Sequence, residues 1–474
     1  MILHFRLLPN DEGFVENEDK EVANANFIYI GRVLSHSAPI SGLTFGYKDA
    51  REILISVSQD KYSVEYDLHS SSTSTGIEVV GNANKEDSGR SRLELTGVPT
   101  AVMWHPHLED DAEDRFIITN SEFKFKEFNA DSKQCRKTTL APTFGISSSS
   151  TTGVTNGVPN RLIPLPIPAD SKPTSAAQNN PRKGILRHYV YATPNRVIGI
   201  GCFPLTGNPD EVIGLVAHPA KISDLAVTYD GKYVFTSGGQ DLSVNMWSTN
   251  VQPLVNVVQN PSMDPFYSLM EEGGGTSGEL YNNIIDYFYY CQLRSQGENV
   301  MEARAITGRI PIAEISTLMR AIGYFPSEDE ITNMTNEVRY QHFMTTGVMS
   351  YDIKLEDFIK LYVNHRPLFP LSSSNIDSAF SEIVNFVKKS KEKRRPGTNN
   401  STGGRHLTMD ENNFDTLASF EDNEGAISWL DLCQLLAIEG ESLSNGDMLS
   451  CLTALMGEDT DKENCKKILG VLTE

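Results

Sequence analysis

The chain has 474 residues and a formal net charge of −21 at pH 7, with hydrophobic residues at 39%, and this length predicts two or three folded units. The acidic balance excludes nucleic acid as the main partner, because phosphate binding needs a cationic surface. No apolar run is long enough for membrane insertion, and six scattered cysteines without a CxxC pair indicate reduced thiols in a cytosolic compartment.

The first 255 residues carry short β-branched and aromatic runs separated by turn residues, a pattern typical of antiparallel sheets. The N-terminal MILHFRLLP is apolar but lacks a basic lead and a cleavage site, so it predicts a strand rather than a signal peptide. Later runs such as EILISVSQD, RFIITN and KYVFTSGG continue the pattern. The region is therefore expected to form a β-sandwich or a β-propeller.

An internal repeat favours the propeller. One unit begins at His218 and has an Asp six residues before its terminal Trp. An earlier unit begins at His36 and has an Asp six residues before Tyr66. Weaker units follow Val98 and surround residues 188–200. Repetition at this spacing is expected of blades that each contribute one small sheet.

These units resemble WD repeats. In that family a His, a strand Ser, a turn Asp and an aromatic residue link the strands of a blade through buried hydrogen bonds. The resemblance implies two such structural sets, which are His218, Ser237, Asp241 and Trp247, and His36, Ser56, Asp60 and Tyr66. A buried, hydrogen-bonded histidine needs no further role, so we expect neither catalysis nor metal binding from these histidines.

Only three or four blades are recognisable, whereas propellers close with four to eight, and an open set leaves sheet edges unpaired. Degenerate sequence could hide further blades, a second chain could complete the propeller, or an N-terminal part could lie outside this sequence; the last two are favoured. Residues 69–92 and 141–184 are polar and predict loop insertions within a propeller part at 1–255. Residues 256–278, with their glycine run, predict a flexible linker.

From Glu279 onward the apolar spacing becomes helical. Ser327 and Glu330 predict a capping box at the start of one helix. The register of IPIAEISTLMRAIGYFPSEDEI resembles calmodulin-type paired EF-hands. It implies a first EF-hand-like pair at 279–366 and a second, degenerate pair at 371–474 with an insert at 391–416. The predicted fold class is therefore multidomain, a partial WD-repeat β-propeller followed by a calmodulin-like helical domain.

Calcium coordination is not expected in the EF-hand-like loops. A competent loop needs oxygen ligands at positions 1, 3 and 5, Gly at 6 and a bidentate Glu at 12. The first loop keeps Gly308 and Glu314 but has Ala303 and Ala305 where ligands belong. The third loop supplies weak calcium candidates at Asp422, Glu424, Ser428 and Asp431. Because it has Phe at position 1 and a shorter Asp at position 12, no metal and no cofactor are predicted.

The only basic cluster is KKSKEKRR at 388–395, inside the second helical pair. A solvated loop accounts for it without any further function. The functional interpretation is a contact with an acidic surface such as tubulin, made by Lys393, Arg394 and Arg395 with salt-sensitive affinity.

The combination of the two halves in this order points to one family more specifically than either half does alone. WD repeats that lead into YFYYCQLRSQG, IPIAEISTLMRAIGYFPSEDEI and LYVNHRP resemble the cilia- and flagella-associated WD-repeat proteins with a C-terminal EF-hand-like domain. The resemblance is strongest over residues 185–366. It implies a non-catalytic scaffold of the ciliary or flagellar axoneme, in the calmodulin- and spoke-associated complex at the base of the third radial spoke. The implied partners are other spoke-base proteins, the doublet microtubule and calmodulin, and the implied role is anchoring the spoke for motility.

Two other functions stay open at this point. One is a calcium-responsive regulatory adaptor whose helical lobes open when they bind metal. The other is a substrate adaptor of a ubiquitin ligase, which is a common use of propellers, although no recruiting motif is evident. An enzyme is not expected, because the sequence lacks HExxH, GxSxG, a P-loop and a dinucleotide fingerprint.

Overall fold

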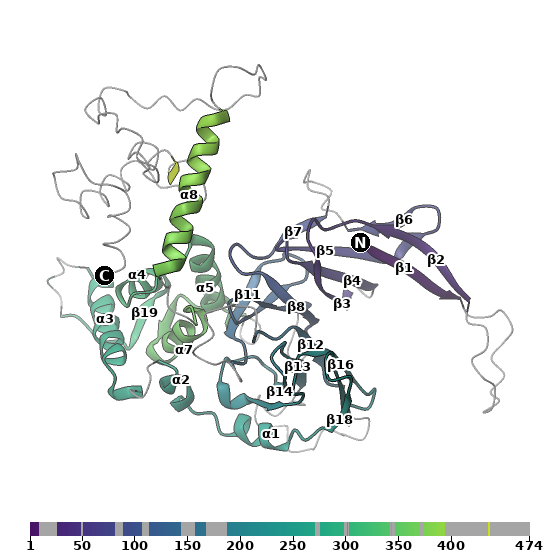
Figure 1. Cartoon of the computed structure of the whole chain (residues 1–474). Coiled ribbons are helices and arrows are strands. Elements are labelled where there is room, and N and C mark those ends of the chain that lie inside the picture. The colour runs from purple at the N-terminus through teal and green to yellow at the C-terminus, as the bar shows by residue number, and fades with distance from the viewer. Residues whose placement is uncertain are drawn as a thin grey trace. The chain divides into compact units, whose positions relative to one another are not determined.

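The computed structural model describes residues 1–8, 26–48, 51–80, 89–106, 113–143, 157–166, 187–270, 275–297, 301, 303–341, 343, 347–368, 373–393 and 435–436. The chain divides into two compact units, Met1–Leu368 and Phe369–Glu474. Figure 1 labels the helices and strands. Among the described residues no helix is long and apolar enough to cross a membrane.

The first unit begins with four antiparallel sheets, the blades of a partial β-propeller (Figure 1). Short turns join most successive strands, so each sheet is mainly a meander. Blade one contains β3 (Ile40–Lys48), β4 (Arg51–Ser58), β5 (Tyr62–Ser72) and β6 (Gly76–Val79), with β7 (Arg90–Arg92) also paired to β5. Blade two contains β8 (Pro99–Trp104), β9 (Arg115–Asn120), β10 (Lys124–Asn129) and β11 (Cys135–Leu140). Blade three contains β12 (Arg161–Pro164), β13 (His188–Ala192), β14 (Val197–Cys202) and β15 (Val212–Val216). Blade four contains β16 (Ile222–Val227), β17 (Tyr233–Gly238) and β18 (Val244–Ser248).

Neighbouring blades pack through the alternate apolar residues of their strands. Ile55 and Val57 of β4 share one buried cluster with Ile118 of blade two. The inner strands of these two blades approach closely at Gly46, where a Cβ would lie 2.4 Å from the ring of Trp104. A glycine at this position therefore lets β3 and β8 pack in direct contact.

Two segments predicted as loop insertions contain strands. The first, 69–92, includes the end of β5, β6 and β7, and Ile77 and Val79 pack against the cluster around Tyr66. The second, 141–184, includes β12, whose Leu162 is buried. The insertion prediction is corrected at these strands, because a few apolar residues inside a polar segment are enough to complete a blade edge.

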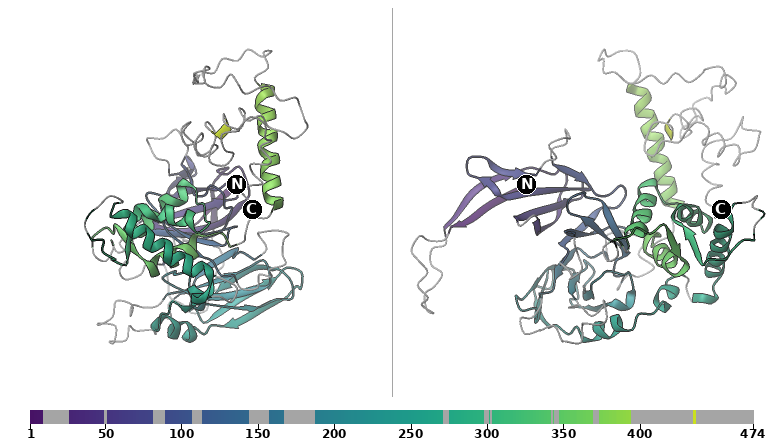
Figure 2. Two further views of the ribbon diagram at one scale, coloured as in Figure 1. Left: turned by 90° about the vertical axis from the view of Figure 1, so that its left-hand side faces the viewer. Right: turned by 180° about the vertical axis from the view of Figure 1, so that it is seen from behind.

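A separate hairpin precedes blade one. It consists of β1 (Ile2–Leu8) and β2 (Asn26–Val33), which pair antiparallel with an irregularity between His4 and Phe5. Ile2 is buried in one cluster with Leu54 of β4 and Tyr66 of β5. The hairpin therefore packs on a face of blade one, beside its outer strands (Figure 2).

Helices occupy part of the segment predicted as a flexible linker. Helix α1 (Gln252–Gln259) buries Leu254, and α2 (Asp264–Ser268) buries Phe266. Phe266 and Met270 belong to the core of the following helices. The linker prediction for 256–278 is corrected for α1 and α2, because apolar residues before the glycine run, such as Phe266 and Met270, are buried in the helical core. Residues 271–274 lie outside the described residues.

The helical lobe, residues 264–368, contains two successive helix–loop–strand–helix segments. The first comprises α3 (Glu279–Ser295), β19 (Arg309–Pro311), a 3-10 turn (Ile312–Glu314) and α4 (Ile315–Ala321). The second comprises α5 (Glu328–Tyr340), β20 (Asp352–Lys354) and α7 (Leu355–His365). Strands β19 and β20 pair antiparallel with Ile310 opposite Ile353, and α5 begins with the predicted capping box of Ser327 and Glu330.

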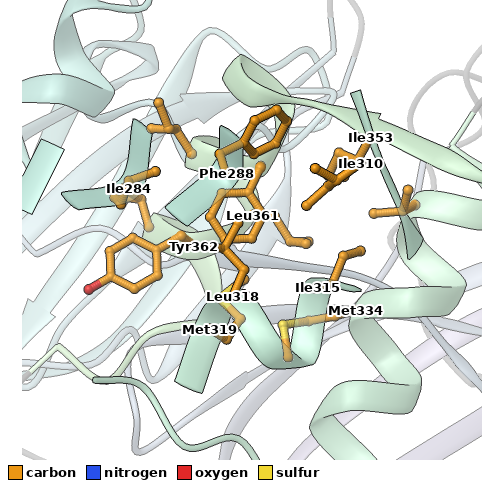
Figure 3. Packing of buried hydrophobic residues seen from close by; sticks show 14 of the residues in the cluster. Ile284, Phe288, Ile310, Ile315, Leu318, Met319, Met334, Ile353, Leu361 and Tyr362 are labelled. Atoms are coloured by element: carbon orange, nitrogen blue, oxygen red, sulfur yellow. The ribbon is translucent and has the colours of Figure 1, made fainter. Parts of the chain in front are cut away.

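One apolar core joins these segments. Figure 3 shows its side chains converging from α3, α4, α5, α7 and both short strands. Ile284 and Phe288 lie one helical turn apart on α3, as the sequence spacing predicted. Leu318 and Met334 are fully buried in the same core.

In the second unit the structure describes α8 (Ser373–Lys393) and residues 435–436. The predicted second EF-hand-like pair at 371–474 and its insert at 391–416 lie mostly outside the described residues.

Candidate docking scaffold

Blade one contains a chain of buried hydrogen bonds that links its strands. His36 Nδ1 lies 3.0 Å from Asp60 Oδ2 and donates to it, because a carboxylate can only accept. The Nε2 atom of the same ring lies 2.7 Å from Ser56 Oγ and accepts its proton. Ser56 in turn lies 2.9 Å from the Tyr66 hydroxyl, which also contacts Ser35. The predicted residues His36, Ser56, Asp60 and Tyr66 therefore lie in one contiguous network.

The protonation states fit this direction of donation. Burial lowers the pKa of His36, so the ring is neutral and Nε2 is free to accept. Burial alone would raise the pKa of Asp60, but backbone donors from Ser37 and Tyr62 and the bond from His36 outweigh it and lower that pKa. An ionised Asp60 that orients a neutral His36 is an electrostatically stable pair at neutral pH.

Blade four repeats the network with one different member. His218 Nδ1 lies 2.8 Å from Asp241 Oδ2, and Nε2 lies 2.8 Å from Thr236 Oγ1. Trp247 Nε1 donates to the same Thr236 oxygen over 2.9 Å. The His218 hydrogen bond lowers the pKa of the Asp241 carboxyl. The residue between histidine and tryptophan is thus Thr236, whereas the repeat alignment predicted Ser237.

The cross-strand register explains this correction. Ser56 lies two residues beyond Leu54, which pairs with Tyr66. Thr236 lies two residues beyond Val234, which pairs with Trp247, so it occupies the corresponding position. In blade one Asp60 lies four positions after Ser56, whereas in blade four Asp241 lies five positions after Thr236. Counting four positions back from Asp241 therefore selects Ser237, the wrong strand residue. Because side chains alternate, Ser237 points to the other face and donates to Asp224 O over 3.4 Å.

The two neighbouring residues offer a matched test. We expect Thr236→Val to lower the free energy of unfolding by about 1–3 kcal/mol, because it keeps the shape of the side chain and leaves two buried partners unpaired. Ser237→Ala should change it by less than about 0.5 kcal/mol. Urea denaturation followed by tryptophan fluorescence measures both. Equal effects of the two substitutions would contradict the assignment of Thr236.

Blade two carries a buried ion pair instead of a histidine network. Lys126 Nζ lies 2.7 Å from Glu94 Oε2, and Asn120 donates to Glu94 Oε1 over 3.1 Å. Burial raises the pKa of Glu94, while Lys126 opposes that effect. Glu122 N donates to the Asn120 side chain as Asp60 N donates to Ser58 Oγ, so Asn120 takes the place that Ser58 holds in blade one, and Glu122 takes the place of Asp60. The weaker repeat signal in this unit therefore reflects a real change of chemistry.

The propeller and the helical lobe are joined by buried hydrogen bonds, which we call the propeller–helix junction. Its centre is Asn364, near the end of α7 and only 3% exposed. The Asn364 Oδ1 atom accepts from the backbone N–H of Leu140 in β11 over 3.1 Å. Its Nδ2 atom donates to the carbonyl of Thr206 over 3.1 Å. A Cβ at Gly207 would lie 1.9 Å from Asn364 Oδ1, so this glycine makes room for the amide.

A buried lysine completes the same contact. Lys124 of β10 donates from Nζ to the backbone carbonyls of Asn364 and Arg366, the latter over 2.7 Å. These carbonyls lie at the C-terminus of α7, where a cationic donor is favourable. Arg366 in turn donates to the backbone carbonyls of Leu269 and Met270. The end of α7 is thereby bound both to blade two and to the segment after α2.

Helix α5 adds a second row of contacts to β11. Glu337 Oε2 accepts from the backbone N–H of Thr138 over 3.1 Å and lies 3.0 Å from His365 Nε2. The guanidinium of Arg136 lies 5.1 Å from the ring centre of Tyr340. The predictions from sequence missed all of these residues. The signal available was LYVNHRP, where Asn364 and His365 are polar side chains buried at the end of an apolar helix.

Two side chains of α3 bind the residues that follow it. The Gln292 side chain is 1% exposed, and its Oε1 accepts from the backbone N–H groups of Thr307 and Gly308, each over 3.1 Å. Arg294 Nη2 lies 2.7 Å from Glu314 Oε2. Thr307, Gly308 and Glu314, which precede α4, are therefore bound by an amide and a guanidinium of α3.

The remaining predicted site residues belong to the second unit. Lys393 is the last residue of α8, and its side chain lies outside the described residues together with Arg394 and Arg395. The weak calcium candidates Asp422, Glu424, Ser428 and Asp431 also lie outside them. Within the described ranges no group of three or more His, Cys, Asp or Glu residues could hold a metal ion.

A partial propeller with WD-type hydrogen-bond networks, joined through buried polar contacts to a helical lobe, defines the class of this protein as a β-propeller protein with a helical C-terminal lobe. The family model of the CFAP251 C-terminal domain matches residues 279–471. "Cilia- and flagella-associated protein 251" of Tetrahymena thermophila is 32% identical over 473 residues, which cover 95% of this chain and 44% of that protein. The protein of the same name from Mus musculus is 32% identical over 437 residues, covering 90% of this chain and 28% of that one. The chain is a homologue of cilia- and flagella-associated protein 251.

The chain spans less than half the length of these relatives. Among solved structures, the β-propeller domain of Myceliophteria thermophila Cps50 (Swd1) matches 47% of this chain and 56% of its own, with 11% sequence identity and a TM-score of 0.28.

Proposed function

We propose that this chain is a non-catalytic structural scaffold of the ciliary axoneme that helps to anchor the third radial spoke to the doublet microtubule and supports motility. The observation that carries the proposal is the propeller–helix junction. Asn364 and Lys124 fix two binding folds to each other through buried bonds, as an anchor that transmits force between two partners requires. The homology to cilia- and flagella-associated proteins supports the placement in the axoneme.

The experiment is removal of the protein from a ciliated cell, followed by electron tomography of the axoneme and analysis of the beat. We expect loss of the third spoke and impaired motility, both restored by a tagged copy whose tag lies at the spoke base. Intact third spokes in the absence of the protein would contradict the anchoring role. A tag found outside the axoneme would contradict the location as well.

We further propose that residues 279–366 form an EF-hand-like pair that works without calcium. Pairing of β19 with β20 through Ile310 and Ile353 supports this geometry. The predicted ligand at position 12, Glu314, is bound to Arg294, so a guanidinium occupies the partner position that a cation would need. A calcium-responsive adaptor is the alternative, since one carboxylate and Gly308 of a calcium loop are retained.

Calcium titration distinguishes the calcium-independent pair from the calcium-responsive adaptor. We expect no saturable heat in the micromolar range when calcium is added to the whole chain, because Ala303 and Ala305 supply no ligand. We expect Arg294→Ala to lower the free energy of unfolding by about 0.5–1 kcal/mol. The control Arg320→Ala removes an ion pair to Glu328 that is more exposed, and should cost less than about 0.3 kcal/mol. A stabilisation of several kelvin by calcium would favour the regulatory adaptor.

A contact between the basic cluster and the microtubule is a separate proposal, which rests on charge alone. Reversal of Lys393, Arg394 and Arg395 to Glu should weaken co-sedimentation with microtubules about tenfold at low salt, because tubulin is acidic. The control makes the same change in net charge elsewhere, at Lys221, Lys232 and Lys354. Equal loss in both variants would mean that net charge, not this cluster, governs binding.

The open arc of blades supports a last proposal, that strands from outside this sequence complete the propeller. Blade four has three strands where blades two and three have four. Val244 and Met246 of its last strand are 70% and 62% exposed. Apolar residues at a strand that no other described strand covers are typical of a surface that pairs with another chain segment.

A further inference from the structure

The Met263–Met270 segment, which contains α2, has the spacing of an amphipathic helix. Its backbone makes successive helical turns, which begin with the N–H of Phe266 donating to the carbonyl of Met263 and end with that of Met270 donating to Tyr267. Residues at the first, fourth, fifth and eighth positions of a helix lie on one face, and here they are large side chains. They are Met263, Phe266, Tyr267 and Met270.

This face packs into the helical lobe. Phe266 and Met270 are each 3% exposed, in one cluster with buried residues of α3 and α7. The Tyr267 ring packs edge-on against Tyr281 of α3, with 5.5 Å between the ring centres. The ammonium of Lys360 on α7 lies 5.9 Å from the centre of the Phe266 ring. The first and last helices of the two repeated segments therefore both contact α2 (Figure 1).

The lobe also binds the C-terminal end of the Met263–Met270 segment. Arg366, directly after α7, donates from its guanidinium to the carbonyls of Leu269 and Met270, the latter over 3.3 Å. The last carbonyls of a helix have no partner within that helix, and a cationic donor is favourable there. Proteins that bind an amphipathic helix recognise apolar anchors at positions i, i+3, i+4 and i+7. The segment presents anchors at this spacing, and Arg366 adds a contact with its end.

The Met263–Met270 segment is additional to the internal repeat of the lobe. Each helix–loop–strand–helix segment begins with a long helix, α3 or α5, and α2 precedes the first of these. The second segment has no equivalent of α2, since only residues 322–327 separate α4 from α5. The Met263–Met270 segment therefore packs on the pair as an added helix, which is how a bound ligand helix packs.

We propose that the helical lobe has a binding site for an amphipathic helix with apolar anchors at positions one, four, five and eight, and that residues 263–270 occupy this site in cis. A helix of the same kind from another protein enters the site only by displacing this segment. The competition favours the segment, because a short covalent connection holds it near the site at a high effective concentration. The inference goes beyond the proposed function, since it depends on packing inside the lobe and not on calcium or on a location in the axoneme.

The test measures, by fluorescence anisotropy, how a labelled peptide with the sequence of residues 260–270 binds to the whole chain. Combining Phe266→Ala with Met270→Ala removes the two buried anchors of the cis segment. We expect the peptide to bind this variant about tenfold or more tightly than it binds the wild-type protein, because the cis competitor is lost. The matched control combines Phe325→Ala with Met301→Ala, at side chains of the lobe that are 76% and 101% exposed, and should bind the peptide as the wild-type protein does.

A second peptide, with alanine at the positions of Phe266 and Met270, serves as the control ligand. It should bind the variant about tenfold more weakly than the unchanged peptide does, because it lacks the anchors. A rise in melting temperature of several kelvin with the unchanged peptide, absent from the wild-type protein, should accompany binding. Circular dichroism checks that the variant is folded. If it is not, Phe266→Leu takes its place, and the peptide should bind this protein more tightly than wild type.

Three outcomes would overturn the inference. Equal affinity of the peptide for the wild-type protein and for the folded variant would mean that the Met263–Met270 segment is an inseparable part of the core. Equal affinity of the two peptides would mean that the anchors are not recognised. Binding to the wild-type protein as tight as binding to the variant with both anchors removed would mean that the cis segment does not occupy the site. None of these results bears on spoke anchoring, which tomography tests separately.

Discussion

Asn364→Ala is expected to lower the free energy of unfolding by about 2–4 kcal/mol, since it leaves two buried backbone groups without partners. The amide of Asn364 is the only side chain that bonds both the N–H of Leu140 and the carbonyl of Thr206 among the described residues. Both groups lie at the contact between blade two and the helical lobe. Urea denaturation measures the loss.

Asn364→Ala should also separate the unfolding transition of the helical lobe from that of the propeller. With the junction weakened, we expect the helical lobe to unfold before the propeller, so that tryptophan fluorescence and helical circular dichroism no longer coincide. The described tryptophans, Trp104 and Trp247, lie in blades, so fluorescence reports on the propeller once Trp429, which lies outside the described residues, is replaced by Phe. The control is Asn282→Ala on the exposed side of α3, which should change stability by less than about 0.5 kcal/mol. Coincident transitions in Asn364→Ala would contradict a junction that couples the two folds.

The bonds of Asn364 also bear on the proposed anchoring role, because they fix the orientation of the helical lobe on the propeller. A propeller and a helical lobe connected by a chain segment alone would move independently, and tension on one would not orient the other. Buried polar bonds have direction, so they fix an orientation that apolar packing alone would leave freer to slide. Under the proposed function, Asn364→Ala should therefore weaken spoke anchoring even at temperatures where both folds persist, which tomography of the third spoke would measure.

The sequence predicted the elements that repeat. The spacing of His36, Asp60 and Tyr66 encodes the blade network, because each residue has a fixed place in a short meander. The prediction was wrong at Ser237, where one extra turn residue shifts the count and only the pairing of Val234 with Trp247 identifies Thr236. Local patterns thus predict strands well, and cross-strand register decides which strand residue faces the core.

The junction could not be predicted in the same way. Lys124 and Asn364 are 240 residues apart, and no periodicity links a lysine in a strand to a carbonyl at the end of a helix. The packing of α2 in the helical lobe was equally hidden, because Met263, Phe266 and Met270 have the spacing of any amphipathic helix. Which core such a helix joins depends on elements elsewhere in the chain, and this information lies outside the helix itself.

Lys124 predicts a dependence of stability on pH. Burial lowers its pKa from 10.5 to about 7, and the nearby Arg366 acts in the same direction while Glu122 opposes it. Between pH 7 and pH 10.5 the unfolded chain would hold a proton that the folded chain has lost. Stability should therefore rise with pH across this window, and fall as the pH drops through 7.

We expect the wild-type protein to gain about 2–4 kcal/mol between pH 7 and pH 10 relative to Lys124→Met, since each unit of pKa shift corresponds to about 1.4 kcal/mol. Methionine keeps most of the apolar stem and removes the amine. Buried thiols such as Cys135 and tyrosines such as Tyr191 have raised pKa values and destabilise the fold at high pH, but they are common to both proteins and cancel in the difference. Urea denaturation at each pH measures that difference.

A neutral amine still has two N–H groups for the two carbonyls of Asn364 and Arg366, so the junction keeps its bonds when the proton leaves. Parallel curves for the two proteins would mean that Lys124 titrates as an exposed lysine does, and that the junction is open to water.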